Sequence, residues 1–153
     1  MEIERKFVLR APPPGLEEHP HARIEQGYVA LDPNGTEVRV RRKGDNRTLT
    51  IKSGSGLVRT EQEAELDASR YDALWPLTDG RRVVKTRYEI PLQDGLTAEV
   101  DVYEDTLHGL ITAEVEFGDE PASAAFDVPD WLGTEVTGDR RYANRALAVS
   151  GLP

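Results

Sequence analysis

Apolar and polar residues alternate along most of this 153-residue chain, and this period of two is the feature that most constrains its fold. Residues two apart lie on the same face of a strand, so the alternation predicts strands with one apolar and one polar face. We expect strands near residues 2–10, 23–31, 36–43, 47–53, 57–66, 82–92, 96–104 and 110–118. Many strands joined by short turns favour an antiparallel barrel or sandwich over a parallel α/β sheet.

Two segments depart from the strand pattern. Residues 69–77 and 141–150 are predicted to be helices, which end near Gly80 and Gly151. The proline-rich residues 11–21 are predicted to form a loop that is too short to separate domains. We therefore expect residues 1–153 to form a single domain.

The polar faces of the predicted strands carry charged residues in pairs. Arg39 and Arg41 share a face of one strand, and Glu114 and Glu116 share a face of another. Such a face either lies in solvent, where it usually mixes small polar and oppositely charged residues, or lines an interior channel. Serine and threonine are scarce at these positions, which favours the channel. We therefore expect an α+β fold that is mainly β: a closed eight-stranded antiparallel β-barrel with a charged interior and a few flanking helices.

The charges of this channel indicate a class of ligand. Arginine and lysine side chains that converge from several strands favour a polyanion, and arginine suits phosphate oxygens through its forked donors. Carboxylates in the same channel would repel phosphate unless divalent cations lie between them, as Mg²⁺ does when it binds both. The combination predicts phosphoryl transfer. The sequence contains neither the phosphate-binding loop of nucleotide hydrolases nor a dinucleotide-binding glycine motif.

The overall composition excludes several classes of protein. A formal net charge of −9 argues against nucleic acid or an anionic membrane as a partner, and no apolar run approaches the length of a membrane span. The chain has no cysteine, which excludes disulfides and thiolate catalysis and is compatible with the cytoplasm, where we expect the protein. The apolar outer face of such a barrel must be buried by helices, by loops or by a second copy of the chain, so a homodimer is possible.

The charged motifs follow a recognisable order along the chain. The first is Glu2-x-Glu4-x-Lys6, and it is followed by Gln26-Gly27-Tyr28, Val38-Arg39-Val40-Arg41, Leu49-Thr50-Ile51-Lys52, Arg59-x-Glu61-x-Glu63, Lys85-x-Arg87-Tyr88, Glu99-x-Asp101, Ala113-Glu114-Val115-Glu116, Trp131-x-Gly133-x-Glu135 and Tyr142-x-Asn144-x-x-Leu147. In this order the chain resembles the CYTH superfamily, the triphosphate tunnel metalloenzymes, over essentially its whole length. The resemblance implies a closed eight-stranded tunnel with a charged lining.

The resemblance also implies roles for individual residues. The implied ligands of Mg²⁺ or Mn²⁺ are Glu2, Glu4, Asp101, Glu114 and Glu116. The implied phosphate-binding residues are Arg39, Arg41, Lys52, Arg59, Lys85 and Arg87. Lys6 is implied either to bind the terminal phosphate or to help set the protonation of the attacking water, with Tyr28 beside it. Three further acids are expected to orient the cations, to serve as alternative metal ligands or to act structurally, namely Glu61, Glu63 and Glu99.

The function implied is metal-dependent hydrolysis of a triphosphate. Inorganic tripolyphosphate, cleaved to pyrophosphate and phosphate, is the favoured substrate because the recognisable side chains bind phosphates and none obviously binds a base or a thiamine ring. Two alternatives within the superfamily are a class IV adenylyl cyclase and a thiamine, nucleoside or RNA triphosphatase. An alternative of another class is a non-catalytic sensor of polyphosphate or nucleotide.

Overall fold

The computed structural model describes residues 3–55 and 58–153, which form one antiparallel sheet of nine strands. The strands are β1 (Ile3–Val8), β2 (His21–Leu31), β3 (Glu37–Lys43), β4 (Asn46–Ser55), β5 (Val58–Glu65), β6 (Arg82–Pro91), β7 (Thr97–Tyr103), β8 (Ile111–Phe117) and β9 (Thr134–Glu135). The first eight correspond to the predicted strands. The ninth was not predicted.

The helices are short. They are α1 (Ala68–Leu74), α2 (Glu120–Ala125) and α3 (Asn144–Ser150), with 3₁₀ turns η1 (Leu16–Glu18), η2 (Trp75–Thr78), η3 (Gln93–Gly95), η4 (Asp105–Leu107), η5 (Asp130–Leu132) and η6 (Arg140–Tyr142). The two predicted helices are confirmed, each as a 3₁₀ turn next to an α-helix: α1 with η2, and η6 with α3. The helix α2 was not predicted. Within the described part of the chain, no helix is long and apolar enough to cross a membrane.

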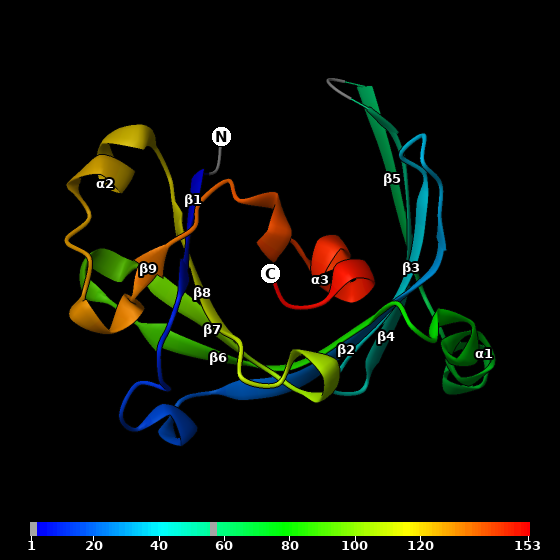
Figure 1. The fold of residues 1–153 in the computed structure, drawn as a ribbon, viewed down its shortest axis with the longest axis horizontal. Coiled ribbons are helices and arrows are strands. Elements are labelled where there is room, and N and C mark those ends of the chain that lie inside the picture. Colours follow the sequence, from blue (N-terminus) through cyan, green and yellow to red (C-terminus); the bar gives the residue numbers. More distant parts are fainter. Residues whose placement is uncertain (1–2, 56–57) are drawn as a thin grey trace.

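The sheet curves into a trough with two separate edges (Figure 1). Its strand order is β5-β4-β3-β2-β6-β7-β8-β1-β9, so β5 is one edge and β9 the other. In Figure 1 these edges lie on opposite sides of the trough, and α3 lies in the concave space between them. We call the strands β1, β7 and β8 the first arm of the trough, and β3, β4 and β5 the second arm, with β2 and β6 between them.

The closed eight-stranded barrel is the prediction that the structure corrects. Closure would require β1 to pair with β5, but β1 pairs with β9 at that edge, where the Val136 amide donates to the Lys6 carbonyl at 2.8 Å. The interior is also occupied, because Leu147 and Ala148 of α3 pack in a cluster with Tyr28. A short strand thus covers the edge and a helix fills the space that closure needs. The fold remains mainly β, but the sheet is open.

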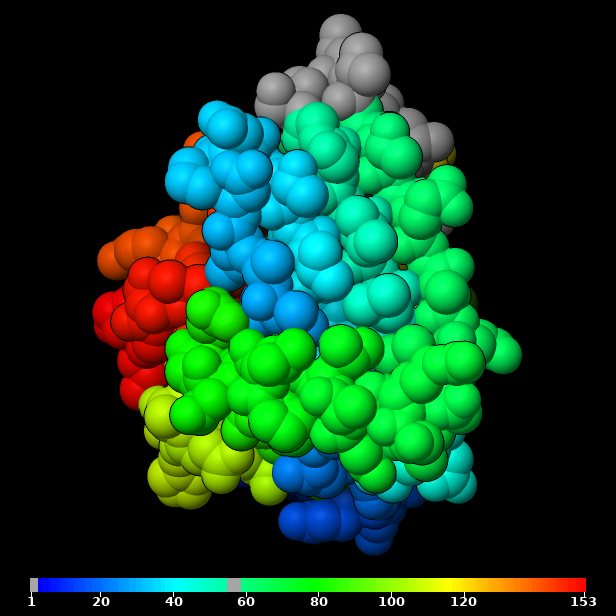
Figure 2. All heavy atoms as spheres, turned by 90° about the vertical axis from the view of Figure 1, so that its right-hand side faces the viewer, coloured from blue at the N-terminus to red at the C-terminus, as the bar shows by residue number. Residues whose placement is uncertain are grey.

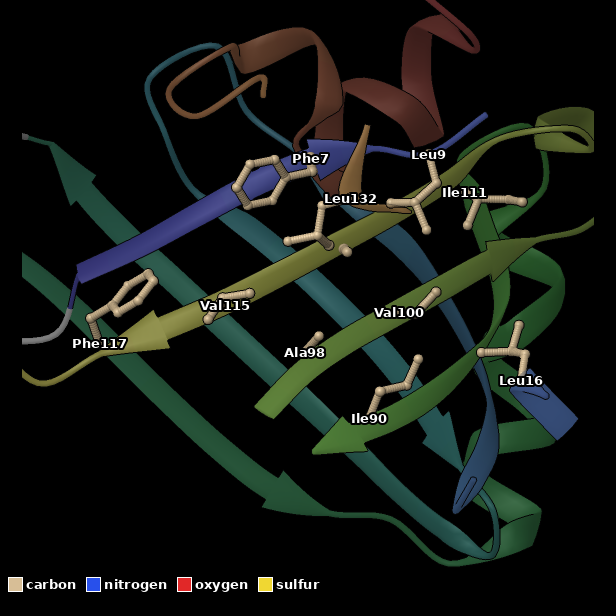
Figure 3. Close-up of a cluster of buried hydrophobic side chains, with 11 residues drawn as sticks. Phe7, Leu9, Leu16, Ile90, Ala98, Val100, Ile111, Val115, Phe117 and Leu132 are labelled. Atoms are coloured by element: carbon tan, nitrogen blue, oxygen red, sulfur yellow. The ribbon is translucent and has the colours of Figure 1, made fainter. Parts of the chain in front are cut away.

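The convex face of the first arm is apolar and is covered by the chain itself. The segment from α2 to η5 lies over it, and the ring of Phe126 meets that of Phe117 edge-on at 5.2 Å between centroids. The buried cluster beneath consists of Phe7, Leu9, Leu16, Ile90, Ala98, Val100, Ile111, Ala113, Val115, Phe117 and Leu132 (Figure 3). Because these apolar side chains lie on the convex side, the charged side chains that alternate with them along the same strands must face the concave side.

On the convex side, η2 packs on the central strand β2, and α1 reaches β4 of the second arm, where the Arg47 guanidinium lies 6.0 Å from the centroid of the Tyr71 ring. In Figure 2 this segment, in green, covers the lower part of the face, and the blue-to-cyan strands emerge above it. A Cβ atom added at Gly27 of β2 would lie 2.4 Å from the Cβ of Thr78, so only glycine allows η2 to pack this closely. Tyr71 of α1 is buried, and its hydroxyl donates to Glu25 Oε1 at 2.9 Å. Both arms are therefore held from outside.

Candidate active site

The register of the sheet assembles the charged motifs on the concave face. Glu99 lies opposite Glu114, which in turn lies opposite Lys6, and Arg87 lies opposite Asp101. On the second arm Arg39 and Arg41 occupy the same face. Acids are therefore concentrated on the first arm, and cations on β3, β4 and the central strand β6. Most of the predicted site residues share this one surface.

Three arginines converge at the centre of the trough. Burial lowers the pKa of Arg41 below its ordinary value, and the charges of Arg87 and Arg39 lower it further. The Nε atoms of Arg39 and Arg41 are buried and have no hydrogen-bond partner within the described residues. Buried donors are normally satisfied, and guanidinium groups pair well with phosphate oxygens. This cluster, which we call the arginine cluster, therefore has the charge and the free donors to bind a polyanion.

Asp101 fixes two of the predicted phosphate-binding side chains. It accepts hydrogen bonds from Arg87 Nε and Nη2 at 2.8 and 2.9 Å, and Lys85 Nζ lies 2.8 Å from its Oδ2 atom. Burial would raise the pKa of Asp101, but the hydrogen bonds from Arg87 and the charge of Lys85 outweigh it, and the pKa lies below its ordinary value. Both carboxylate oxygens are thus engaged by cations. That Asp101 also binds metal stays a prediction.

The acids of the first arm form a group with like charge. Glu4 lies opposite Glu116, and its pKa is raised by burial first and then by Glu114 and Glu99, while Lys6 acts in the opposite direction. Such repulsion is relieved by a divalent cation, so the chemistry of the donors fits Mg²⁺ or Mn²⁺.

The described residues do not contain a complete metal site. Among residues 3–55 and 58–153, no three Asp, Glu, His or Cys side chains are gathered closely enough to hold an ion. Glu2, the remaining predicted ligand, lies outside the described residues. The assignment of Glu4, Glu114 and Glu116 as ligands therefore stays a prediction.

The two predicted catalytic side chains have different surroundings. Lys6 Nζ donates to the Tyr142 carbonyl at 2.7 Å and lies 3.3 Å from Glu114 Oε1, so it belongs to the acidic group. The hydroxyl of Tyr28 accepts from Gln26 Nε2 at 3.2 Å, and the ring is buried in the cluster beneath α3. Burial and the charge of Glu37 raise the pKa of Tyr28. The contacts of the described residues do not join Tyr28 to Lys6.

The other predicted residues extend the site along the second arm. Lys52 lies opposite Glu37 on one side and Glu61 on the other, and with Arg59 it lines a cavity of about 310 Å³. Glu63 is exposed and lies opposite Thr50. Glu99 of the first arm forms an ion pair with Arg87 at 3.1 Å. Glu99 thus contacts a cation of the site and Glu61 lies across the sheet from one, and which of the three expected roles these acids have stays a prediction.

The helix α3 adds residues to the site that were not predicted. Asn144 Oδ1 accepts from Lys85 Nζ at 3.3 Å, and Arg145 lines the cavity of Lys52 and Arg59. On the other side of the helix, a cavity of about 400 Å³ is lined by Glu4, Lys6, Glu114, residues 136–140, Ala143 and Asn144. Asn144 stood in the last sequence motif, but no signal distinguished Arg145 from a surface arginine.

Comparison with known proteins identifies the family, although no family model matches the chain. It is 46% identical to an inorganic triphosphatase of Nitrosomonas europaea over 149 residues, which cover 97% of both chains. It is 38% identical to an inorganic triphosphatase of Acetivibrio thermocellus, over 95% of this chain and 92% of that one. A crystal structure of an inorganic triphosphatase aligns with a TM-score of 0.87 and 42% identity, over all of this chain and 97% of the other. The chain belongs to the inorganic triphosphatases of the CYTH superfamily, as its motifs predicted.

Proposed function

We propose that the concave face of the sheet hydrolyses inorganic tripolyphosphate to pyrophosphate and orthophosphate, with the help of Mg²⁺ or Mn²⁺. The observation that supports the proposal is the arginine cluster, which faces an arm of carboxylates. The Nε atoms of Arg39 and Arg41 have no hydrogen-bond partner among residues 3–55 and 58–153. Two relatives that are similar over nearly the whole chain are inorganic triphosphatases. The enzyme is therefore a hydrolase of phosphoanhydride bonds.

The cations bind and align the substrate. Arg39 and Arg41 direct donors to the phosphate oxygens from β3, and Arg87 does so from β6. Because Asp101 already holds Arg87 and Lys85 through hydrogen bonds and an ion pair, these two side chains need little reorganisation when the substrate binds. Lys52 and Arg59 continue the cationic surface along the second arm.

The acids of the first arm hold the metal. We assign Glu4, Glu114 and Glu116 as its ligands, with Glu2 and Asp101 as the further members of the predicted set. A divalent metal held by these acids would neutralise phosphate charge and lower the pKa of the attacking water. We assign Lys6, whose Nζ atom lies 3.3 Å from Glu114 Oε1, either to bind the terminal phosphate or to help set the protonation of the attacking water. The predicted homodimer and the cytoplasmic location remain predictions.

A product assay on the wild-type protein tests this function. Tripolyphosphate, ATP and thiamine triphosphate are offered with Mg²⁺ and then with Mn²⁺, and orthophosphate, pyrophosphate and cyclic AMP are measured together. We expect tripolyphosphate to be cleaved far faster than the other two, without cyclic AMP, and excess EDTA to abolish turnover. Cyclic AMP as the main product of ATP would indicate a cyclase. A triphosphate that binds but stays uncleaved over hours with either metal would indicate a sensor.

A further inference from the structure

A second group of cations lies on the side of α3 that faces the second arm. Lys52 from β4, Arg59 from β5 and Arg145 from α3 line one cavity of about 310 Å³, so three separate elements each supply one cation. Two acids, Glu37 and Glu61, also line it and flank Lys52 across the sheet. The resemblance to the superfamily accounts for Lys52 and Arg59 but not for Arg145.

This cavity continues from the arginine cluster. Arg39 of β3 lies opposite Thr50 of β4, and Lys52 follows two residues later on the same face. Diagonal neighbours of this kind have Cα atoms about 7–8 Å apart, within the reach of long side chains. A linear chain of phosphates bound at the arginine cluster can therefore extend into the cavity of Lys52, Arg59 and Arg145.

Arg145 lies on a helix that is held in place, but its own side chain has no polar partner among the residues that the structure describes. Its neighbour Asn144 accepts a hydrogen bond from Lys85, and Leu147 and Ala148 anchor the same helix in the cluster with Tyr28. The side chain of Arg145 is exposed and makes no hydrogen bond or ion pair with any described residue. Its forked donors are therefore available to a ligand, on a helix whose position is fixed.

The two cavities beside α3 differ in their chemistry. Acids exceed cations in the cavity toward the first arm, which is lined by Glu4, Glu114 and Asp139 with Lys6 and Arg140. Cations exceed acids in the cavity toward the second arm, which is lined by Lys52, Arg59 and Arg145 with Glu37 and Glu61. A triphosphate that spans the trough would place one terminal phosphate near the metal-binding acids. Its other two phosphates would then lie toward the cations.

We propose that Arg145, together with Lys52 and Arg59, binds the pyrophosphate portion of the substrate and the pyrophosphate product. This assignment rests on the proposed function. During hydrolysis a water oxygen bonds to the terminal phosphorus near the acids, and the bond from that phosphorus to the bridging oxygen breaks. The water gives up its proton, and pyrophosphate leaves with the bridging oxygen. Arg145 contacts the same two phosphates before and after this step, so it contributes to binding more than to the rate of cleavage.

Variants of Arg145 test the subsite. Loss of a charged hydrogen-bond donor is expected to raise the pyrophosphate inhibition constant roughly 10- to 100-fold in Arg145→Ala. The KM for tripolyphosphate should rise in parallel, while kcat stays within about threefold, as for an interaction made equally in ground and transition states. Arg145→Lys should restore most of the affinity. The matched control is Arg70→Ala, which removes an exposed arginine from α1, outside the trough (Figure 1), and should change none of these values.

Direct titration of pyrophosphate by calorimetry separates this inference from the proposed function, because it needs no turnover. If the wild type fails to cleave tripolyphosphate but binds pyrophosphate in a manner that depends on Arg145, the hydrolase proposal falls and the subsite stands. If the wild type cleaves tripolyphosphate and Arg145→Ala binds pyrophosphate as the wild type does, the subsite is refuted. An equal loss of affinity in Arg70→Ala would also refute it.

Discussion

Replacing Arg41 should weaken catalysis without weakening the fold. Arg41 is partly buried on β3, its Nε atom has no partner in the described chain, and its pKa is lowered by burial and then by Arg87 and Arg39. A lowered pKa means that the folded state disfavours the positive charge at this position. Arg41→Met keeps most of the length of the side chain and removes the charge, so it removes the repulsion together with the phosphate contact.

The expected change in the unfolding free energy of Arg41→Met follows from the spacing of residues along a strand. Residues two apart on one strand are about 7 Å apart, and two unit charges at that distance repel by ~2 kcal/mol at an effective dielectric constant of 20. Arg41 remains partly exposed, and solvent screening reduces this value, so we expect a gain in unfolding free energy of about 0–2 kcal/mol. Loss of its contact with the transition state should cost ~2–4 kcal/mol, which lowers kcat/KM roughly 30- to 1000-fold.

Two measurements test whether Arg41 acts in the active site or in the fold. Urea unfolding without substrate gives the stability of Arg41→Met and wild type, and initial rates with tripolyphosphate give kcat/KM for both. We expect Arg41→Met to be as stable as wild type or more stable, and to show the large loss in kcat/KM. A variant that is less stable by more than about 1 kcal/mol, yet keeps kcat/KM within about threefold, would show that Arg41 acts in the fold and not in the site.

Three further predictions concern the carboxylates. Asp101→Asn leaves Lys85 buried without its countercharge and should lower the free energy of unfolding by ~3–5 kcal/mol; a urea midpoint like that of wild type would contradict this. Glu4→Gln and Glu116→Gln should each cut turnover severely while the melting temperature is retained, and near-normal rates in both would refute their role as metal ligands. Hydrogen bonds from Arg5 on β1 and from Thr137 lower the pKa of Glu135 to about 2. The stabilisation that these bonds give the folded state is therefore complete above the ordinary pKa of 4.5, and it is lost as the pH falls through 2. Glu135→Gln should therefore melt below wild type at pH 7, and the gap should narrow toward pH 2; a constant gap would contradict the assignment.

The division of each strand into an apolar and a charged face was predictable because side chains alternate strictly along a strand. Arg39 with Arg41, and Glu114 with Glu116, were expected on one surface, and the register brings their strands onto the concave side of one sheet. The apolar partners of these residues, such as Val115, form the convex core. The period of two along each strand indicates which residues share a face, even when the pairing of the strands is unknown.

The openness of the sheet was not predictable from the same pattern. The edge of β1 is covered by only two residues of β9, too few to produce a periodic signal. The apolar positions Leu147 and Ala148 predict a helix, but not that its apolar side packs inside the trough against Tyr28. Whether a curved sheet closes depends on such long-range contacts, and so does the role of Arg145, which only the position of α3 reveals.

The most direct test of the proposed active site is the fate of the oxygen atom of the attacking water. Tripolyphosphate is hydrolysed in ¹⁸O-labelled water with Mg²⁺ or Mn²⁺, and the products are resolved by ³¹P nuclear magnetic resonance. With the attacking water on the acidic arm and the pyrophosphate portion among the cations, one ¹⁸O atom should enter orthophosphate and none should enter pyrophosphate. Label in the pyrophosphate would contradict this placement of the substrate. No cleavage with either metal would contradict the claim that the trough is the active site of a triphosphatase.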